Sequence, residues 1–342
     1  MSALEVLEAG PEHAGQVLGV IHRAFSARPV LDPPSTATQE SVESVAATLE
    51  GSGGLLALRR SIAVGAVLFD RSRPGQLGLA RVSVDPAQQG HGVASAMVGV
   101  AEDVAESLGL DGVWLLSRAE LPENQVFWSR RGYLPVASNG PVIELGKTLW
   151  LALPVTSAED MQRLGERLTG LLRPGDVVVL TGELGAGKTT LAQGIGSGLD
   201  VRGPITSPTF VIAREHPALA GGPPLVHADA YRLGGAAELD DLDLDTSLED
   251  SVTVVEWGHG LAEGLSDAWL DVRIDRVRGD GGGEGMAALA AAGPSRDRVP
   301  TPLDPIRGED CRVVSLRPHG PRWVGAPLRS TLLAETRRDV PC

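Results

Sequence analysis

Glycines and one lysine are concentrated in the run GELGAGKTT, at Gly182–Thr190. The spacing G-x-x-x-x-G-K-T lets successive backbone N–H groups turn toward one anion, and the lysine adds a positive charge. The apolar run Val177–Leu180 before it is typical of a buried parallel strand, and the residues after it predict a helix to about Leu199. A chance glycine-rich turn would need neither a strand before it nor a helix after it. We therefore interpret the run as a P-loop that binds the phosphates of ATP.

Two residues of this loop have distinct expected roles. Lys188 is expected to reach the β- and γ-phosphates, and the Thr189 hydroxyl is expected to bind Mg²⁺. The helix that begins here turns its positive dipole end toward the phosphates. The loop residues expected to contact ATP are Gly182, Glu183, Leu184, Gly185, Ala186, Gly187, Lys188, Thr189 and Thr190.

Acidic residues end two other apolar runs. The run VTVVE predicts a strand over Val252–Glu256, whose terminal carboxylate would lie beside Mg²⁺ and its water. Asp229 lies in the run HADAYR, at the end of a predicted strand over Leu225–Asp229. The structural alternatives are a solvent-exposed strand end for Glu256 and a turn position for Asp229.

The N-terminal half has a second glycine-rich turn, QGHGVA, at Gln89–Ala94. It lies between a strand predicted over Leu77–Val84 and a helix predicted over Ala94–Leu108. Small residues and free backbone amides at the start of a helix form an anion site that suits a pyrophosphate.

The chain of 342 residues is long enough for two domains. Residues 1–147 are expected to form one α/β unit. A second α/β unit is expected over residues 148–323, beginning with a strand at Thr148–Leu153. Within it, the glycine- and proline-rich residues 279–308 predict a flexible insertion, and the alternative is a segment that folds on a partner. Residues 324–342 are expected to form a loose tail.

Composition argues against several classes of function. The net charge is −14, so the chain lacks the basic footprint of a protein that binds nucleic acid directly. No run is long enough to span a membrane, and no secretion signal is evident. Cys311 and Cys342 form no metal or disulfide spacing, which predicts a cytoplasmic protein with free thiols. The acidic run Glu238–Asp250 is expected to be a solvated helix face rather than a partner surface.

Four motifs of the second half occur in a specific order. They are the P-loop GELGAGKTT, SPTF at Ser207–Phe210, HADAYR at His227–Arg232 and VEWG at Val255–Gly258. Together they resemble TsaE, the small bacterial ATPase of the tRNA threonylcarbamoyladenosine pathway. The resemblance covers about Leu153–Arg276 and a closing strand near Arg312–Leu316.

This resemblance implies a P-loop NTPase fold and a Mg²⁺-dependent ATPase. Thr189 and Glu256 would hold the metal. Trp257 would lie near the nucleotide, and Ser157 would approach its adenine side. The catalytic or switching residues would be Lys188, Thr209, Asp229 and Glu256.

The resemblance also implies protein partners. TsaE-like ATPases bind the TsaB–TsaD pair, and the pathway places an N6-threonylcarbamoyl group on adenosine 37 of tRNAs that read codons beginning with A. The ATPase itself would meet tRNA only indirectly, which agrees with the acidic charge.

The first half resembles the GNAT family of N-acetyltransferases over residues 3–146. That family carries Q/R-x-x-G-x-G/A between a strand and a helix, and Phe127–Tyr133 matches its short helix followed by a strand that begins G-F/Y. The resemblance implies a mixed sheet with flanking helices, acetyl-CoA as acyl donor, and an amine substrate that the sequence does not identify. The residues expected to bind acetyl-CoA are Val82, Val84, Gln89, Gly90, Gly92, Val93, Ala94, Ser95 and Asn124.

The sequence departs from this family at Trp128, where a tyrosine often acts as general acid. An indole N–H is not a usable acid. A thiolate can leave unassisted, so an active transferase is favoured over an inert module. Candidates for a general base are Glu120, Glu123 and His91.

The residues are compatible with three functions. The leading hypothesis is a fusion of an acetyltransferase with an ATPase that serves tRNA modification. The alternative is a regulatory protein, in which ATP is a switch and an inert GNAT module senses acyl-CoA. A small-molecule kinase is less favoured because no arginine cluster or lid for a substrate phosphate is evident.

Overall fold

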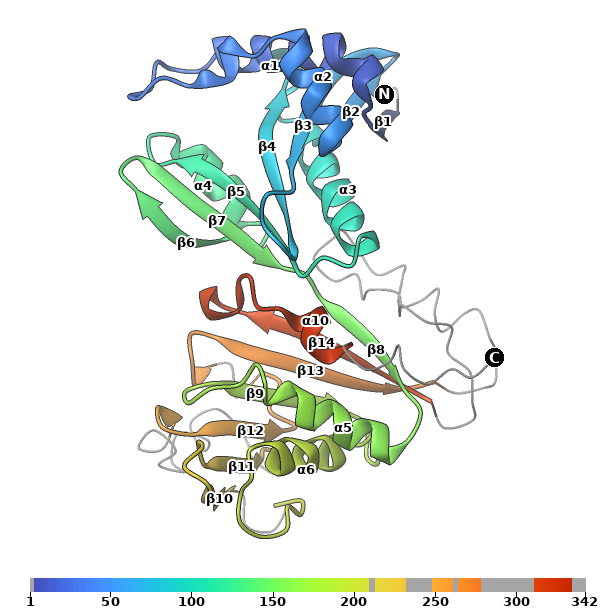
Figure 1. Ribbon diagram of the computed structural model, residues 1–342, viewed down its shortest axis with the longest axis vertical. Coiled ribbons are helices and arrows are strands. Elements are labelled where there is room, and N and C mark those ends of the chain that lie inside the picture. Colours follow the sequence, from blue (N-terminus) through green and yellow to red (C-terminus); the bar gives the residue numbers. More distant parts are fainter. Residues whose placement is uncertain (1–2, 209–212, 232–247, 261–263, 278–310, 334–342) are drawn as a thin grey trace. The chain divides into compact units, whose positions relative to one another are not determined.

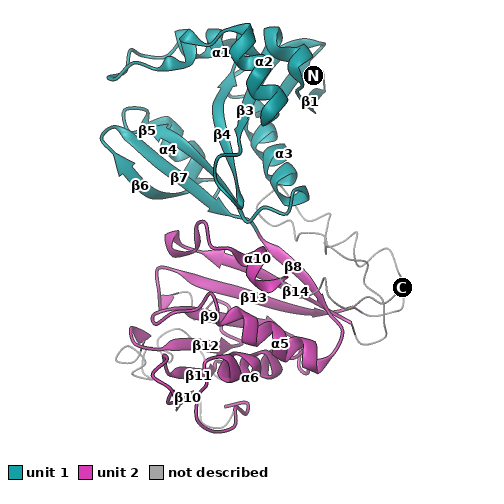
Figure 2. Cartoon of the chain, viewed as in Figure 1, with its two compact units in different colours: residues 1–149 teal, residues 150–342 magenta. Residues whose placement is uncertain are grey.

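The computed structural model describes residues 3–208, 213–231, 248–260, 264–277 and 311–333. The chain forms two compact units, Met1–Leu149 and Trp150–Cys342 (Figure 2), and we describe each by itself. Both are α/β, as the sequence predicts. The division falls after Leu149, whereas we expected it after residue 147.

The first unit contains a seven-stranded mixed sheet of order β1-β2-β3-β4-β5-β7-β6 (Figure 1). Only β4 and β5 run parallel, and the other neighbours are antiparallel. The strands are β1 (Leu4–Glu8), β2 (Gly54–Arg59), β3 (Ile62–Asp70), β4 (Gln76–Val84), β5 (Gly112–Arg118), β6 (Leu134–Asn139) and β7 (Val142–Thr148).

Helices cover both faces of this sheet. Along β2, Leu55 packs into the core that contains α3 (Val93–Ser107), and its neighbour Leu56 packs against α1 (Ala14–Ser26) and α2 (Val42–Gly51). This alternation follows from the period of two along a strand. The short helices η1 (Pro11–His13), η2 (Thr36–Gln39), η3 (Pro86–Gln88) and α4 (Pro122–Ser129) complete the unit.

The strands β4 and β5 are paired over only part of their length. Their register joins Gln76–Leu79 to Gly112–Leu115 and then stops. Near this point β4 has an irregular register with β3, and Arg81 adopts a positive φ of 52°. The two strands therefore diverge, as Figure 1 shows.

The second unit contains a seven-stranded sheet of order β10-β11-β12-β9-β13-β14-β8. The central strands β11, β12, β9 and β13 are mutually parallel. The strands are β8 (Leu151–Val155), β9 (Val177–Gly182), β10 (Ala213–His216), β11 (Leu225–Asp229), β12 (Val252–Glu256), β13 (Trp269–Arg276) and β14 (Arg312–His319).

Two helices, α5 (Ala158–Leu168) and α6 (Lys188–Gly198), pack together against this sheet. Glycines allow their close approach. A Cβ on Gly165 would lie 2.5 Å from the Leu191 carbonyl oxygen on α6. The pairing holds the start of α6 beside the carboxyl ends of the parallel strands, where ligands bind in open α/β sheets.

Two expectations about the ends of the second unit were wrong. Thr148 does not begin a strand of this unit, because it ends β7 opposite Gly112, and β8 starts at Leu151. Beyond the short η5 (Pro321–Trp323), residues 324–333 are not a loose tail. They include α10 (Leu328–Leu332), whose Leu328 and Leu332 are buried in the core, so apolar burial holds this segment in place.

Several expectations fall outside the described residues. These are the insertion at 279–308, Thr209, and most of the acidic run Glu238–Asp250. Within the part of the chain that is described, no helix has both the length and the apolar character needed to cross a membrane.

Candidate functional site

The glycine-rich loop joins β9 to α6 in a conformation that requires its glycines. Gly185 and Gly187 have φ of 74° and 114°, in the left-handed region that side chains disfavour. A Cβ on Gly182 would lie 2.5 Å from the Ile274 carbonyl oxygen of β13. Gly187 is the N-cap of α6 and offers no side-chain cap, so the first amides of the helix face the loop.

Lys188 lies inside this loop and is buried. Its Nζ donates hydrogen bonds to the carbonyl oxygens of Gly182, at 2.8 Å, and Glu183, at 3.1 Å. It also lies 3.8 Å from the centre of the Trp257 ring. Burial lowers the pKa of the ammonium group, while Glu256 and Asp229 act in the opposite direction. Two carbonyl oxygens of the loop therefore hold the ammonium group of the lysine.

The Thr189 hydroxyl donates to Oε1 of Glu256, at 2.8 Å. Asp229 is the register partner of Glu256 on the adjacent parallel strand, so the two carboxylates end neighbouring strands. Asp229 also accepts a hydrogen bond from the Tyr231 amide, at 2.9 Å. The structure thus brings five of the expected residues to one edge of the sheet, namely Lys188, Thr189, Asp229, Glu256 and Trp257. Both carboxylate residues are buried, which excludes the solvent-exposed strand end for Glu256.

Sequence reasoning gave no role to His227, although it quoted the residue within HADAYR. Its side chain is fully buried, and Nε2 lies 3.0 Å from Oε1 of Glu256. A buried polar side chain in an otherwise apolar strand needs a partner, and this was the available signal.

Two arginines that sequence reasoning also missed hold the loop from other strands. Nη2 of Arg276 donates to the Gly185 carbonyl at 2.9 Å, and Nε of Arg312 donates to the Ala186 carbonyl at 2.8 Å. These hydrogen bonds occupy carbonyl oxygens of the loop, and the Ala186 amide donates to the Glu183 carbonyl oxygen at 3.1 Å.

The oxygen donors present fit Mg²⁺. Among the described residues, no group of three or more His, Cys, Asp or Glu side chains could hold a metal ion. Thr189 and Glu256 offer a hydroxyl oxygen and a carboxylate oxygen that lie 2.8 Å apart. Magnesium commonly binds one or two protein oxygens and completes its shell with phosphate oxygens and water, so this pair suits it when a nucleotide is bound.

Ser157 is the N-cap of α5, and its hydroxyl is hydrogen-bonded with Asp160. The side chain of Leu184, in the middle of the loop, is 88% exposed. The contacts of both residues with ATP stay predictions.

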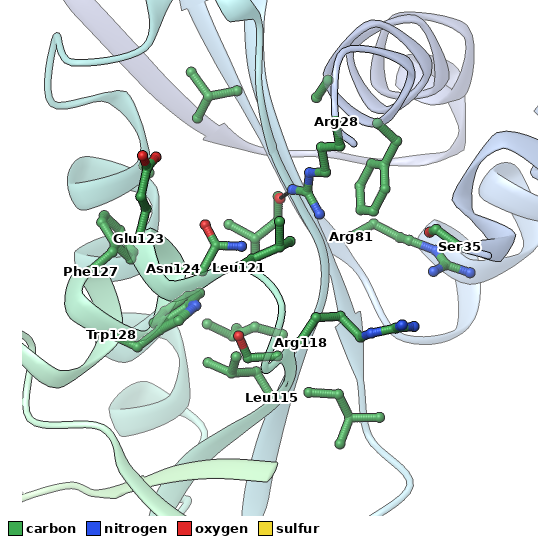
Figure 3. A pocket seen from close by; sticks show the side chains of 18 of the residues that line it. Arg28, Ser35, Arg81, Leu115, Arg118, Leu121, Glu123, Asn124, Phe127 and Trp128 are labelled. Carbon is green, nitrogen blue, oxygen red and sulfur yellow. Dashed lines mark hydrogen bonds between the residues drawn. The ribbon is translucent and has the colours of Figure 1, made fainter. Parts of the chain in front are cut away.

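The first unit contains a cavity of about 1270 Å³ where β4 and β5 diverge (Figure 3). All of the residues expected to bind acetyl-CoA line it: Val82, Val84, Gln89, Gly90, Gly92, Val93, Ala94, Ser95 and Asn124. Gly90 and Gly92 have φ of 76° and 78°, and a Cβ on either would meet no atom within 4 Å. The turn before α3 is therefore open to a ligand, as an anion site requires.

Neither aromatic residue near the expected position of the general acid can supply a proton. Trp128 lines it and packs edge-on against Tyr133, at 4.9 Å between ring centres. The Tyr133 hydroxyl does not replace the missing acid, because it is buried and donates to Glu102 at 3.0 Å. Burial, together with that carboxylate, raises the pKa of Tyr133 well above its usual value.

The three candidate bases differ in position. Glu120 lines the cavity but is held by Arg118, which donates hydrogen bonds that lower the pKa of the carboxyl. Glu123 also lines the cavity and is exposed. His91 is not among the lining residues, and its Nδ1 lies 2.9 Å from the Gln89 carbonyl oxygen.

Two family models match the chain, each within one unit. The family described as "Threonylcarbamoyl adenosine biosynthesis protein TsaE" matches residues 155–281. The acetyltransferase (GNAT) family matches residues 24–133.

Curated relatives match the second unit. A tRNA threonylcarbamoyladenosine biosynthesis protein TsaE from Streptomyces coelicolor is 66% identical over 121 residues, covering 35% of this chain and 82% of the relative. The protein of the same name from Mycobacterium tuberculosis is 60% identical over 126 residues, covering 35% and 75%.

Two solved structures are similar to parts of this chain. YdiB from Bacillus subtilis is 26% identical with a TM-score of 0.37, covering 54% of this chain and 95% of that one. PaiA N-acetyltransferase from Thermoplasma acidophilum, in complex with coenzyme A, is 13% identical with a TM-score of 0.39, covering 43% and 99%.

Proposed function

This chain belongs to the TsaE family of tRNA threonylcarbamoyladenosine biosynthesis proteins, and we propose that its second unit is a Mg²⁺-dependent P-loop ATPase. The observation that carries the proposal is the hydrogen bond from Thr189 to Glu256, made at the start of the helix that follows the loop. It joins the two side chains that a nucleotide-bound metal needs.

Each residue around the loop has a distinct proposed role. The loop amides and the start of α6 would hold the phosphates, while Arg276 and Arg312 keep the loop carbonyls turned away. Lys188 would exchange its two carbonyl acceptors for phosphate oxygens, which are charged and therefore stronger acceptors. Mg²⁺, held by Thr189 and Glu256, would neutralise charge on the phosphates. Asp229 lies beside Glu256 and would orient the attacking water.

The ATPase would act with a TsaB–TsaD-type complex in the cytoplasm, in the formation of N6-threonylcarbamoyladenosine at position 37. The charge of −14 supports contact with tRNA through those proteins rather than directly.

Complementation tests this proposal. The full chain, the Lys188→Ala variant and a control, Arg163→Ala on the exposed face of α5, are expressed in a bacterium depleted of its own TsaE. We expect the full chain and the control to restore the modified nucleoside in tRNA, and the Lys188 variant to fail. Equal restoration by the Lys188 variant would refute the ATPase role of the loop.

The first unit is a GNAT-family domain, and we propose that it transfers an acetyl group from acetyl-CoA to an amine. The amine nitrogen forms a bond to the acetyl carbon, the carbon–sulfur bond breaks, the nitrogen loses a proton and the thiolate gains one. The cavity that joins the anion turn to the gap between β4 and β5 supports this proposal.

One observation favours a second candidate for this unit, an acyl-CoA sensor. No acidic hydroxyl stands at Trp128, and Tyr133 is committed to Glu102. Measuring acetyl-CoA consumption with a panel of amines separates the two. Turnover with any amine refutes the sensor, and tight CoA binding without turnover supports it.

A further inference from the structure

We infer that the acetyl acceptor of the first unit is an amino acid with a free carboxylate, and that Arg28 binds this carboxylate. The inference rests on the acetyltransferase function proposed above and names its substrate class. It comes from the way charges are paired around the cavity.

Two arginines that line the cavity are already neutralised. Nε and Nη2 of Arg81 both donate to Oε1 of Glu40, at 3.0 and 2.9 Å. Arg118 makes a two-pronged pair with Glu120, at 3.1 and 2.7 Å, and donates to two backbone carbonyls as well. Neither guanidinium is available to a ligand without breaking an existing ion pair.

Arg28 differs from both. It follows α1, lines the cavity and is half-buried, and Figure 3 shows its side chain extending toward Leu121 and Asn124. Its Nη2 donates to the Val82 carbonyl oxygen at 3.3 Å, and its guanidinium stacks on the Phe25 ring at 3.8 Å. Among the described residues, no carboxylate pairs with it.

The Arg28 guanidinium has therefore lost part of its hydration without gaining a negatively charged partner. Burial lowers the pKa of Arg28, and no neighbouring anion opposes that effect. Stacking on Phe25 fixes the plane of the guanidinium, which prepares its edge for a two-pronged hydrogen bond to a carboxylate. A ligand that brings a carboxylate would restore the missing counter-charge.

The position of Arg28 also suits an acceptor. Val82, whose carbonyl oxygen accepts a hydrogen bond from Arg28, lies on the part of β4 expected to hold the pantetheine arm of acetyl-CoA. A carboxylate bound there would place an amine on the same small molecule next to the acetyl group. A carboxylate carries one negative charge, which matches the single charge of Arg28, whereas Glu123 lines the same cavity and would repel the second charge of a phosphate.

The test uses the full chain and matched pairs of acceptors, namely the twenty amino acids and their carboxamides, each with acetyl-CoA. We expect at least one amino acid to be acetylated with kcat/KM about 10- to 100-fold above that of its carboxamide, the range for hydrogen bonds to a charged group. Arg28→Met should remove this preference, so that each amino acid and its carboxamide react at similar rates. Arg130→Met, an exposed arginine of the same cavity, should keep it.

A second measurement separates this inference from the proposed transfer. The melting temperature is recorded with each amino acid or carboxamide in the presence of CoA. Stabilisation by amino acids alone, lost in Arg28→Met, supports the carboxylate site even if no acceptor is acetylated, in which case only the transferase function fails. Equal turnover by both members of every pair overturns the inference. So does the absence of any turnover together with amino acids that stabilise the protein no more than their carboxamides.

Discussion

The Thr189 hydroxyl and the Glu256 carboxylate are hydrogen-bonded at 2.8 Å although 67 residues separate them in the sequence. The bond joins the first turn of α6 to the carboxyl end of β12. It exists because β12 is paired in parallel with β9, the strand that leads into the loop. The geometry of the candidate metal site is therefore a product of the order of the strands.

Replacing Glu256 with Gln should lower ATP hydrolysis about 100-fold, because the amide no longer supplies a negative charge to the metal. Nucleotide binding without Mg²⁺ should be unchanged, since the loop amides and Lys188 remain. Hydrolysis and binding of a fluorescent ATP analogue measure the two effects. The exposed Glu249→Gln, on the segment before the same strand, is the control, and equal activity of both variants would refute the metal role.

His227→Phe should raise the Mg²⁺ concentration needed for half-maximal hydrolysis. Nε2 of His227 is 3.0 Å from Oε1 of Glu256, so removing it frees a buried carboxylate to rotate. The free energy of unfolding should fall by about 1–3 kcal/mol, the cost of leaving a buried polar group without its partner. Magnesium titrations and urea unfolding measure these effects.

His227→Gln provides the matched comparison, because its amide can still donate to Glu256. The Mg²⁺ concentration needed for half-maximal hydrolysis should lie between those of the parent and His227→Phe. A purely structural role for His227 predicts lower stability in both variants with no change in that requirement.

Trp128→Tyr should increase the rate of acetyl transfer at least about tenfold, since a phenol can protonate a departing thiolate. Trp128→Phe, which adds no acid, should not. Rates of CoA release at saturating acetyl-CoA, measured across pH, distinguish the variants. Equal rates for Tyr and Phe would mean that proton donation at this position does not limit the reaction.

The first unit should lose stability in acid because protonation of Glu144 removes its ion pair with Arg73. Arg73 donates two hydrogen bonds to its carboxylate, at 2.5 and 2.8 Å, and these hold the pKa of Glu144 below its ordinary value of 4.5. The stabilisation is therefore complete above that ordinary value and is lost as the pH falls through the lower pKa of the folded state. The effect should be modest, because both side chains are partly exposed.

Urea unfolding at intervals between pH 6 and pH 3 measures this loss. Glu144→Gln should be less stable than the parent near neutral pH and should show a smaller fall in acid. The exposed Glu50→Gln should follow the parent. A parallel fall in Glu144→Gln and the parent would exclude this ion pair as the cause.

Local patterns predicted the elements that surround each glycine-rich turn. Val177–Leu180 is a buried strand and Lys188 opens a helix, because apolar run length and glycine spacing act over a few neighbouring residues. The same reasoning placed the anion turn before α3. It was wrong at Thr148 and at residues 324–333, where tertiary contacts decide which unit a short apolar segment joins.

By itself, the sequence determined the two glycine-rich turns, the families they indicate and the chemical types of the expected site residues. Only the tertiary structure decided that Glu256 meets Thr189, that Trp257 covers Lys188, that His227 supports the carboxylate, and that Arg81 and Arg118 are ion-paired in the cavity whereas Arg28 donates only to a backbone carbonyl. The physical reason is that a turn or helix start is set by neighbours in sequence, whereas these contacts depend on strand order and on the pairing of charges from distant segments.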